Sequence, residues 1–164
     1  LSILIPFLKS ESASERRSAV LALGRLRDER AVPHLVQLLS DPDNSTKLNT
    51  ISVLGWIGSS KAVGPLILRL EDGTDDMQVA EALGEIGDKH AIEPLLSVLD
   101  SSYYDTRYRI NEALKKLGHY SEDFVHEEMT EDDIVERNLR IDRMLRDAGL
   151  PPLGANSPSG EVTE

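Results

Sequence analysis

The chain has no cysteine among its 164 residues, and aromatic residues make up only 4% of it. The absence of cysteine excludes disulfides, a thiolate nucleophile and a cysteine-based metal site, and it fits a reducing compartment. With so few aromatic side chains, the core has to be built from Leu, Ile, Val and Ala. Such a core suits closely packed short helices better than a sheet sandwich.

Basic residues are also in short supply, since 18 Lys and Arg stand against 29 Asp and Glu and leave a formal charge of −11. Such a surface repels phosphate backbones, so we expect no nucleic-acid partner. No apolar run approaches about 18 residues and no secretory signal is recognisable, so we expect a soluble, cytoplasmic protein without a membrane partner. The missing initiating Met ahead of an apolar stretch predicts a chain trimmed upstream.

An internal repeat is the main positive feature of the sequence. Four segments spell close variants of Ala-Leu-Gly-x-Ile-Gly, and three of them lead into Ala-Val-x-Pro-Leu or a near match. Aligned on their last residue, the copies lie 31, 29 and 31 residues apart, at Arg27, Gly58, Gly87 and Gly118. A period of this length is typical of helical solenoids.

Hydrophobic periodicity and turn residues divide each repeat into two helices. The predicted helices are 2–9, 14–26, 30–40, 45–57, 61–71, 76–86, 90–100, 104–117 and 131–148. Ser12 and Glu15 suggest a capping box at the first full helix, and Asp28 and Asp88 are predicted N-caps of second helices. Glycines at the ends of the first helices, including Gly55, are attributed to backbone freedom at the turn.

These elements predict an all-α, right-handed solenoid of about four helix pairs. Residues 1–118 form the repeats, the first of them partial. Residues 119–149 hold an acidic segment and an atypical C-terminal capping helix, as terminal solenoid repeats often do. Residues 150–164 lack an apolar period and are predicted to be a flexible tail.

The repeat resembles the HEAT repeats of the phycobilisome-lyase-like type. The resemblance rests on in-phase copies of Val-Arg-x-x-Ala-x-x-Ala-Leu-Gly-x-Ile-Gly-Asp followed by Ala-Ile-x-x-Leu, matched by 16–39, 47–70, 76–99 and 107–118. The basic residue that this pattern carries early in the first helix is Asp76 in the third copy. This departure predicts a weaker ladder of ion pairs at that position.

The resemblance implies an armadillo-like fold and two kinds of relative. Some members attach bilin chromophores to phycobiliproteins, and the scaffold is similar to that of deoxyhypusine hydroxylase, in which His-Glu pairs hold two irons. The one such pair here, His126-Glu127, lies outside the repeats. His119, His126, Glu127 and Glu128 could form a metal site or a solvated acidic loop. The loop is favoured because adjacent residues point in different directions, so we expect no metal and no other cofactor.

Candidate partner-binding residues are those that break the chemistry of a repeat column or lie on the expected concave face. Trp56 stands in a column of charged residues, which suggests a contact anchor, although packing over the groove between repeats is as good an explanation. Leu68 shares a column with Gln37 on the face of the second helices that is expected to be concave. Either it joins Trp56 in an apolar patch, or a slight rotation of its helix buries it. The full set is Trp56, Leu68, Gln37, His34 and Tyr104.

The leading hypothesis is a non-catalytic scaffold or adaptor that binds another protein or peptide through this solenoid surface. The alternative is a bilin-lyase-type subunit or related protein-modifying factor, which needs few catalytic residues because the substrate's own cysteine reacts. A bilin-binding protein requires a groove deep enough for a tetrapyrrole, whereas a scaffold can present a shallow surface. The sequence leaves the oligomeric state open.

Overall fold

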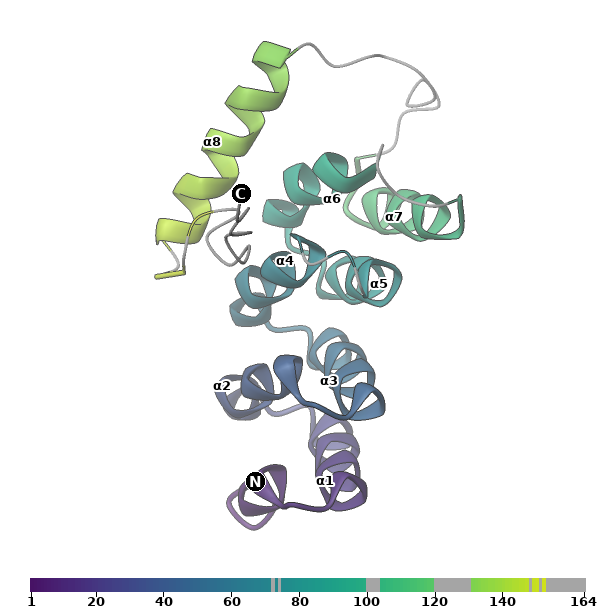
Figure 1. Ribbon diagram of the computed structural model, residues 1–164, viewed down its shortest axis with the longest axis vertical. Coiled ribbons are helices and arrows are strands. Elements are labelled where there is room, and N and C mark those ends of the chain that lie inside the picture. The colour runs from purple at the N-terminus through teal and green to yellow at the C-terminus, as the bar shows by residue number, and fades with distance from the viewer. Residues whose placement is uncertain are drawn as a thin grey trace, which may run out of the picture.

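The computed structural model describes residues 1–71, 73, 75–99, 104–119, 131–147, 149, 150 and 152, and every regular element within them is helical. The helices stack in two layers along one long axis (Figure 1). The first layer contains α1 (Ala13–Leu26), α3 (Asn44–Ile57), α5 (Asp76–Ile86) and α7 (Tyr104–Lys116). The second contains η1 (Ile5–Lys9), α2 (Val32–Leu35) with η3 (Val36–Ser40), α4 (Val63–Glu71) and α6 (Ile92–Leu99).

The all-helical stack of repeats is therefore confirmed, while the right-handed superhelical sense stays a prediction. The predicted helices agree with the observed ones to within a few residues, with two exceptions. The predicted helix 2–9 is only the short 3₁₀ helix η1, and 30–40 is broken into η2 (Glu29–Ala31), α2 and η3. Short 3₁₀ turns also precede the later second-layer helices, as η4 (Ser60–Ala62) and η5 (Lys89–Ala91).

Successive first-layer helices approach closely because a glycine of one helix faces a small residue of the next. A Cβ atom on Gly55 would lie 2.9 Å from the Ala82 Cα, and one on Gly84 would lie 2.9 Å from the Ala113 Cα. Gly24 likewise faces Val53. The interpretation of Gly55 and Gly84 as helix-end glycines is wrong, since both are buried inside helices and serve close packing.

The turn between the two layers does require a residue with a left-handed backbone conformation. In the repeat alignment this residue stands three positions after the buried glycine. Gly58 ends α3 with φ 74° and Gly87 ends α5 with φ 76°, and each backbone N–H caps the preceding turn. Arg27 takes the same place after α1 with φ 48°, although it is not a glycine. The repeat therefore fixes this backbone geometry even where the preferred residue is absent.

The predicted N-caps are confirmed where the second helices begin. The carboxylate of Asp28 accepts a hydrogen bond from the Arg30 N–H, and that of Asp88 accepts one from the His90 N–H. The capping box at α1 is wrong, because Ser12 occupies the N-cap position without a side-chain cap bond. Glu15 instead accepts a hydrogen bond from the Ser10 hydroxyl.

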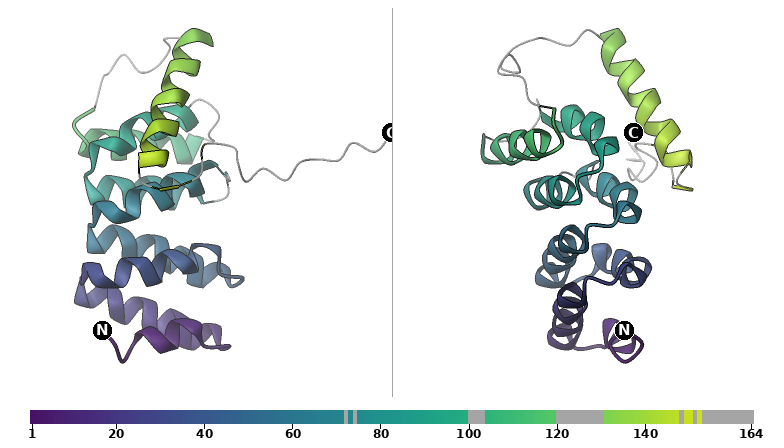
Figure 2. Two further views of the ribbon diagram at one scale, coloured as in Figure 1. Left: turned by 90° about the vertical axis from the view of Figure 1, so that its left-hand side faces the viewer. Right: turned by 180° about the vertical axis from the view of Figure 1, so that it is seen from behind.

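The last described helix, α8 (Glu131–Asp147), lies outside the two-layer stack and packs against α6 (Figure 1; Figure 2, left). It buries Ile141 and Leu145 against the common core. It thus covers the side of the second layer rather than adding another pair to the stack. The division of the chain at 119 and 150 stays a prediction, since the acidic segment 120–130 and the tail 153–164 lie outside the described residues.

Candidate functional site

The second layer carries a groove between η1 and η3 that brings together two of the predicted site residues. His34 and Gln37 both line it, with Leu8 and Lys9 from η1 and Asp41 from the following loop. The groove has a volume of about 220 Å³. His34 is half-buried and Gln37 is exposed, so both side chains can reach a molecule that covers this part of the layer.

An ion pair fixes one wall of this groove. The guanidinium of Arg16 donates to both oxygens of Asp41, at 2.7 Å from Nε and 2.8 Å from Nη2, and Nη1 donates to the Ser10 carbonyl. Burial opposes ionisation of Asp41, yet the hydrogen bonds from Arg16 and from the Asp43 N–H outweigh it. They hold the pKa of the Asp41 carboxyl below its usual value.

The third copy differs at this position. Asp76 stands where Arg16 stands in α1, and its Oδ1 atom is buried with no hydrogen bond in the part of the chain that the structure describes. Next to it, Arg69 from α4 donates to Asp75 at 2.6 Å. Position 101, which corresponds to Asp41, lies outside the described residues, so the weaker ladder at this copy stays a prediction. Burial, and then the charge of Asp75, raise the pKa of Asp76.

Trp56 lies in the first layer, on the other side of the stack from the His34 groove. Its ring packs over Gly24 of α1, since a Cβ atom there would lie 3.3 Å from Trp56 Cε3. It remains 47% exposed. Part of the ring thus packs between repeats and part is exposed, and a role as a contact anchor stays a prediction.

The remaining predicted site residues are not brought into one patch with Trp56. Leu68 lies on α4 in the second layer and is half-buried against the core. Its helix α4 and the helix α3 that carries Trp56 belong to different layers, and an apolar patch that joins the two residues stays a prediction. Tyr104 begins α7, but its side chain lies outside the described residues. Of the other tyrosines, Tyr108 is exposed.

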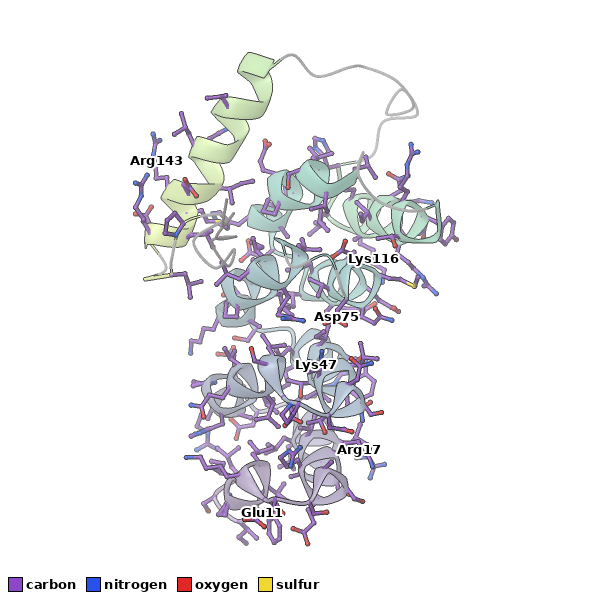
Figure 3. The ribbon with its side chains drawn as sticks, viewed as in Figure 1. Glu11, Arg17, Lys47, Asp75, Lys116 and Arg143 are labelled. Carbon is purple, nitrogen blue, oxygen red and sulfur yellow. The ribbon has the colours of Figure 1, made fainter. Side chains whose placement is uncertain are left out.

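A second and larger groove lies where α8 approaches the start of α4, with a volume of about 450 Å³. The stack contributes the apolar surface of Val63 and Gly64 together with the hydroxyl-bearing Ser60, and η5 contributes His90. The contribution of α8 is mainly cationic and apolar. Its lining residues are Arg140, Arg143, Met144 and Asp147, and Arg143 is labelled in Figure 3.

The charges around this groove are partly paired. Asp88 accepts from His90 at both the backbone N–H and Nδ1, the latter at 2.7 Å. Burial opposes ionisation of Asp88, but these hydrogen bonds prevail and lower its pKa. The Nη1 atom of Arg140 lies 3.8 Å from Oε1 of Glu93, which is a weak ion pair. Arg143 makes no ion pair within the described ranges, so its guanidinium is available in the groove.

The α8 groove is the site that sequence reasoning missed. Arginines recur every third residue along this helix, away from its apolar stripe, and that spacing places neighbours on one side. By itself this spacing is equally typical of a solvated helix face. Its meaning depends on α8 packing beside α4 and α6, and no residue pattern in the repeats specifies that contact.

Two further properties of the described residues bear on the class of site. Among the described residues, no group of three or more His, Asp or Glu side chains is placed to hold a metal ion. His126, Glu127 and Glu128 lie outside those residues, and His119 is half-buried after α7. In the same part of the chain, none of the helices has the length and apolar character needed to cross a bilayer.

Comparison with known families agrees with this architecture. Residues 1–77 match the profile of HEAT repeats, and residues 77–101 match that of the PBS lyase HEAT-like repeat. The two matches together cover the stack from η1 to the end of α6.

Two curated relatives share part of this region. The phycocyanobilin lyase subunit alpha of a Picosynechococcus species is 31% identical over 124 residues, which cover 65% of this chain and 46% of that protein. The subunit of the same name from a Nostoc species is 33% identical over 86 residues, which cover 52% of this chain and 29% of that protein. The chain thus spans less than half the length of either relative.

Proposed function

Because the chain is a HEAT-repeat protein that includes a PBS lyase HEAT-like repeat, we propose that it acts as a bilin-lyase-type subunit. Its role is to hold a phycobiliprotein while a bilin is attached to it. The observation that carries this proposal is the similarity to phycocyanobilin lyase alpha subunits from two organisms. It favours the lyase-type alternative over a scaffold unrelated to bilins.

We place the protein-binding part of this role on the second layer. HEAT-type stacks offer extended surfaces whose exposed positions can differ without disturbing the shared core. Around the η1–η3 groove, Gln37 is exposed and Lys9 supplies a positive charge. The largely buried ion pair between Arg16 and Asp41 joins α1 to the loop that borders the groove, so we expect this wall to move little on binding. A contact there costs little reorganisation, which favours affinity.

The first test is direct binding of the purified chain to the apo-α and apo-β chains of a phycobiliprotein, followed by biolayer interferometry. We expect a saturable complex with one of them. The double variant His34→Ala/Gln37→Ala should weaken it by about tenfold, as loss of central interface contacts does. The matched control is Arg25→Ala, at an exposed first-layer position, which should leave the affinity unchanged.

The second test measures function. Covalent bilin on the phycobiliprotein is followed by fluorescence after denaturing electrophoresis, with and without this chain and with the other subunit of such a lyase present. Attachment that depends on the chain supports the proposal. Binding without any effect on attachment would leave only the scaffold hypothesis, and absence of binding to both chains would overturn the proposed partner.

A further inference from the structure

The groove between α4 and α8 brings apolar and basic side chains together in an acidic chain. It combines an apolar floor, from Val63, Gly64 and Met144, with guanidinium groups along one side, from Arg140 and Arg143. Its volume of about 450 Å³ lies within the range of pockets for organic ligands. It is far larger than a site for an inorganic ion would need to be.

The cationic side of this groove is supplied by α8 alone. Arg140 and Arg143 are three residues apart, so they lie on neighbouring parts of one helix face. Planar guanidinium groups bind carboxylates through paired hydrogen bonds, which a lysine cannot reproduce. Arg143 is the stronger candidate of the two, because Arg140 already lies near Glu93.

The acidic groups near the groove limit which anion can bind. Asp88 is engaged by His90, and Glu93 lies beside Arg140. Asp147 is exposed and has no ion pair within the described part of the chain. A small, highly charged anion would face this carboxylate directly. An apolar molecule with carboxylates at its edge can instead bury its body against Val63 and Met144 and direct a carboxylate to Arg143.

We infer that the α4–α8 groove binds an organic ligand with an extended apolar body and carboxylate groups, held by Arg143 and, secondarily, by Arg140. On the proposed function, from which the identity of the ligand follows, this is an open-chain tetrapyrrole with its two propionates. The stack supplies the apolar floor and α8 supplies the carboxylate contacts. Binding in this groove leaves the η1–η3 groove free for the protein partner.

The test titrates the full chain with biliverdin, followed by absorbance and by isothermal titration calorimetry. The dimethyl ester of biliverdin keeps the same apolar body without ionised carboxylates. We expect saturable binding of biliverdin and at least tenfold weaker binding of the ester. Inorganic phosphate at the same concentration should not displace biliverdin, because it lacks the apolar body.

Three variants locate the ligand. Arg143→Gln should weaken biliverdin binding by about tenfold, which corresponds to one charge-assisted contact. Arg146→Gln removes an exposed arginine of the same helix that does not line the groove, so it should change the affinity by less than about twofold. Asp147→Asn removes the opposing carboxylate and should tighten binding. Circular dichroism verifies that each variant is folded.

Equal affinities for biliverdin and its ester, or equal effects of Arg143→Gln and Arg146→Gln, would overturn the inference, as would displacement by phosphate. The titration needs no phycobiliprotein, so its outcome is separate from that of the proposed function. Biliverdin binding without any protein complex would contradict only the protein-holding role. A protein complex without biliverdin binding would contradict only the groove assignment.

Discussion

The two layers of the stack are built from the same repeats but hold together in different ways. First-layer helices meet through residues that lack a side chain, as where Gly55 faces Ala82 and Gly84 faces Ala113. Second-layer helices begin with short 3₁₀ turns, and the grooves that contain His34 and Arg143 lie on that side of the molecule. We infer that the first layer carries most of the stability and that the second carries recognition.

The largest expected effect comes from Gly55→Leu. Its Cβ atom would lie 2.9 Å from the Ala82 backbone, so α3 and α5 would have to separate along their length. We expect a loss of more than about 3 kcal/mol in urea unfolding, beyond the usual range for overpacking. The matched control is Arg25→Leu, at an exposed position of the first-layer helix α1, where stability should be nearly unchanged. Similar losses in both would contradict close packing as the cause.

Asp41→Asn tests the ion pair that borders the second-layer groove. The substitution leaves Arg16 buried without its negative partner, so the melting temperature should fall by several degrees at pH 7. In the wild type, Asp41 and Asp43 have lowered pKa values, and Asp28 is lowered to about 2, first through its side-chain hydrogen bond with Arg30. Groups of this kind stabilise the fold above their unfolded pKa of 3.8.

The contribution of Asp28 is lost as the pH falls from 3.8 to about 2, and those of Asp41 and Asp43 are lost as the pH falls below 3.8. The Asp41→Asn variant should therefore lose less stability in acid than the wild type. Asp76 has the opposite effect on the pH dependence of stability, because its pKa is raised in the folded state. Its contribution favours the folded state at low pH and is lost as the pH rises above 3.8. Thermal melts at pH 2–7 measure the contributions of the aspartates with lowered pKa values and of Asp76. A steeper acid loss in Asp41→Asn than in the wild type would contradict this assignment.

Gly87→Val strains the turn between the two layers without changing the packing within either layer. Nothing lies within 4 Å of a Cβ atom there, so the cost comes from the left-handed backbone and should be roughly 1–3 kcal/mol. Asn tolerates this conformation, and Gly87→Asn should cost clearly less. The denaturant midpoints of the Val and Asn variants distinguish backbone strain from side-chain contacts. Equal losses of stability in the two variants would indicate side-chain contacts.

Trp56→Ala measures how far recognition extends onto the first layer. Because the ring is about half exposed over Gly24, we expect a loss of roughly 1–2 kcal/mol of stability, below the 3–5 kcal/mol typical of core aromatics. If recognition is confined to the second layer, affinity for the phycobiliprotein chain should be unchanged. A tenfold weaker complex would place Trp56 in the interface, as its position in a column of charged residues suggested.

The smallest effect is expected from Arg27→Gly. Arg27 holds a φ of 48°, at which glycine lacks the steric penalty of a side chain. Glycine also loses more chain entropy on folding, so the two effects partly cancel. We expect a gain below about 1 kcal/mol in thermal melts. A loss of stability would show that the Arg27 side chain makes a contact worth more than the strain.

The sequence by itself determined the repeat, the helix positions and the turn geometry. These properties follow from local chemistry, such as the carboxylate of Asp28 capping a helix or Gly58 ending one, and three copies in phase reinforce each signal. The same pattern indicated the family. Local signals did not separate the two glycine columns, because a glycine in a helix and a glycine after it look alike until the neighbouring helix is placed.

Only the tertiary structure decided which residues share a surface. It put Trp56 and Leu68 in different layers, joined His34 and Gln37 in one groove, and brought α8 beside α4 so that Arg143 borders another. The physical reason is that these contacts join segments far apart in the chain. In particular, α8 is fixed by burying Ile141 and Leu145, whose spacing specifies a buried helix face but not the surface that covers it.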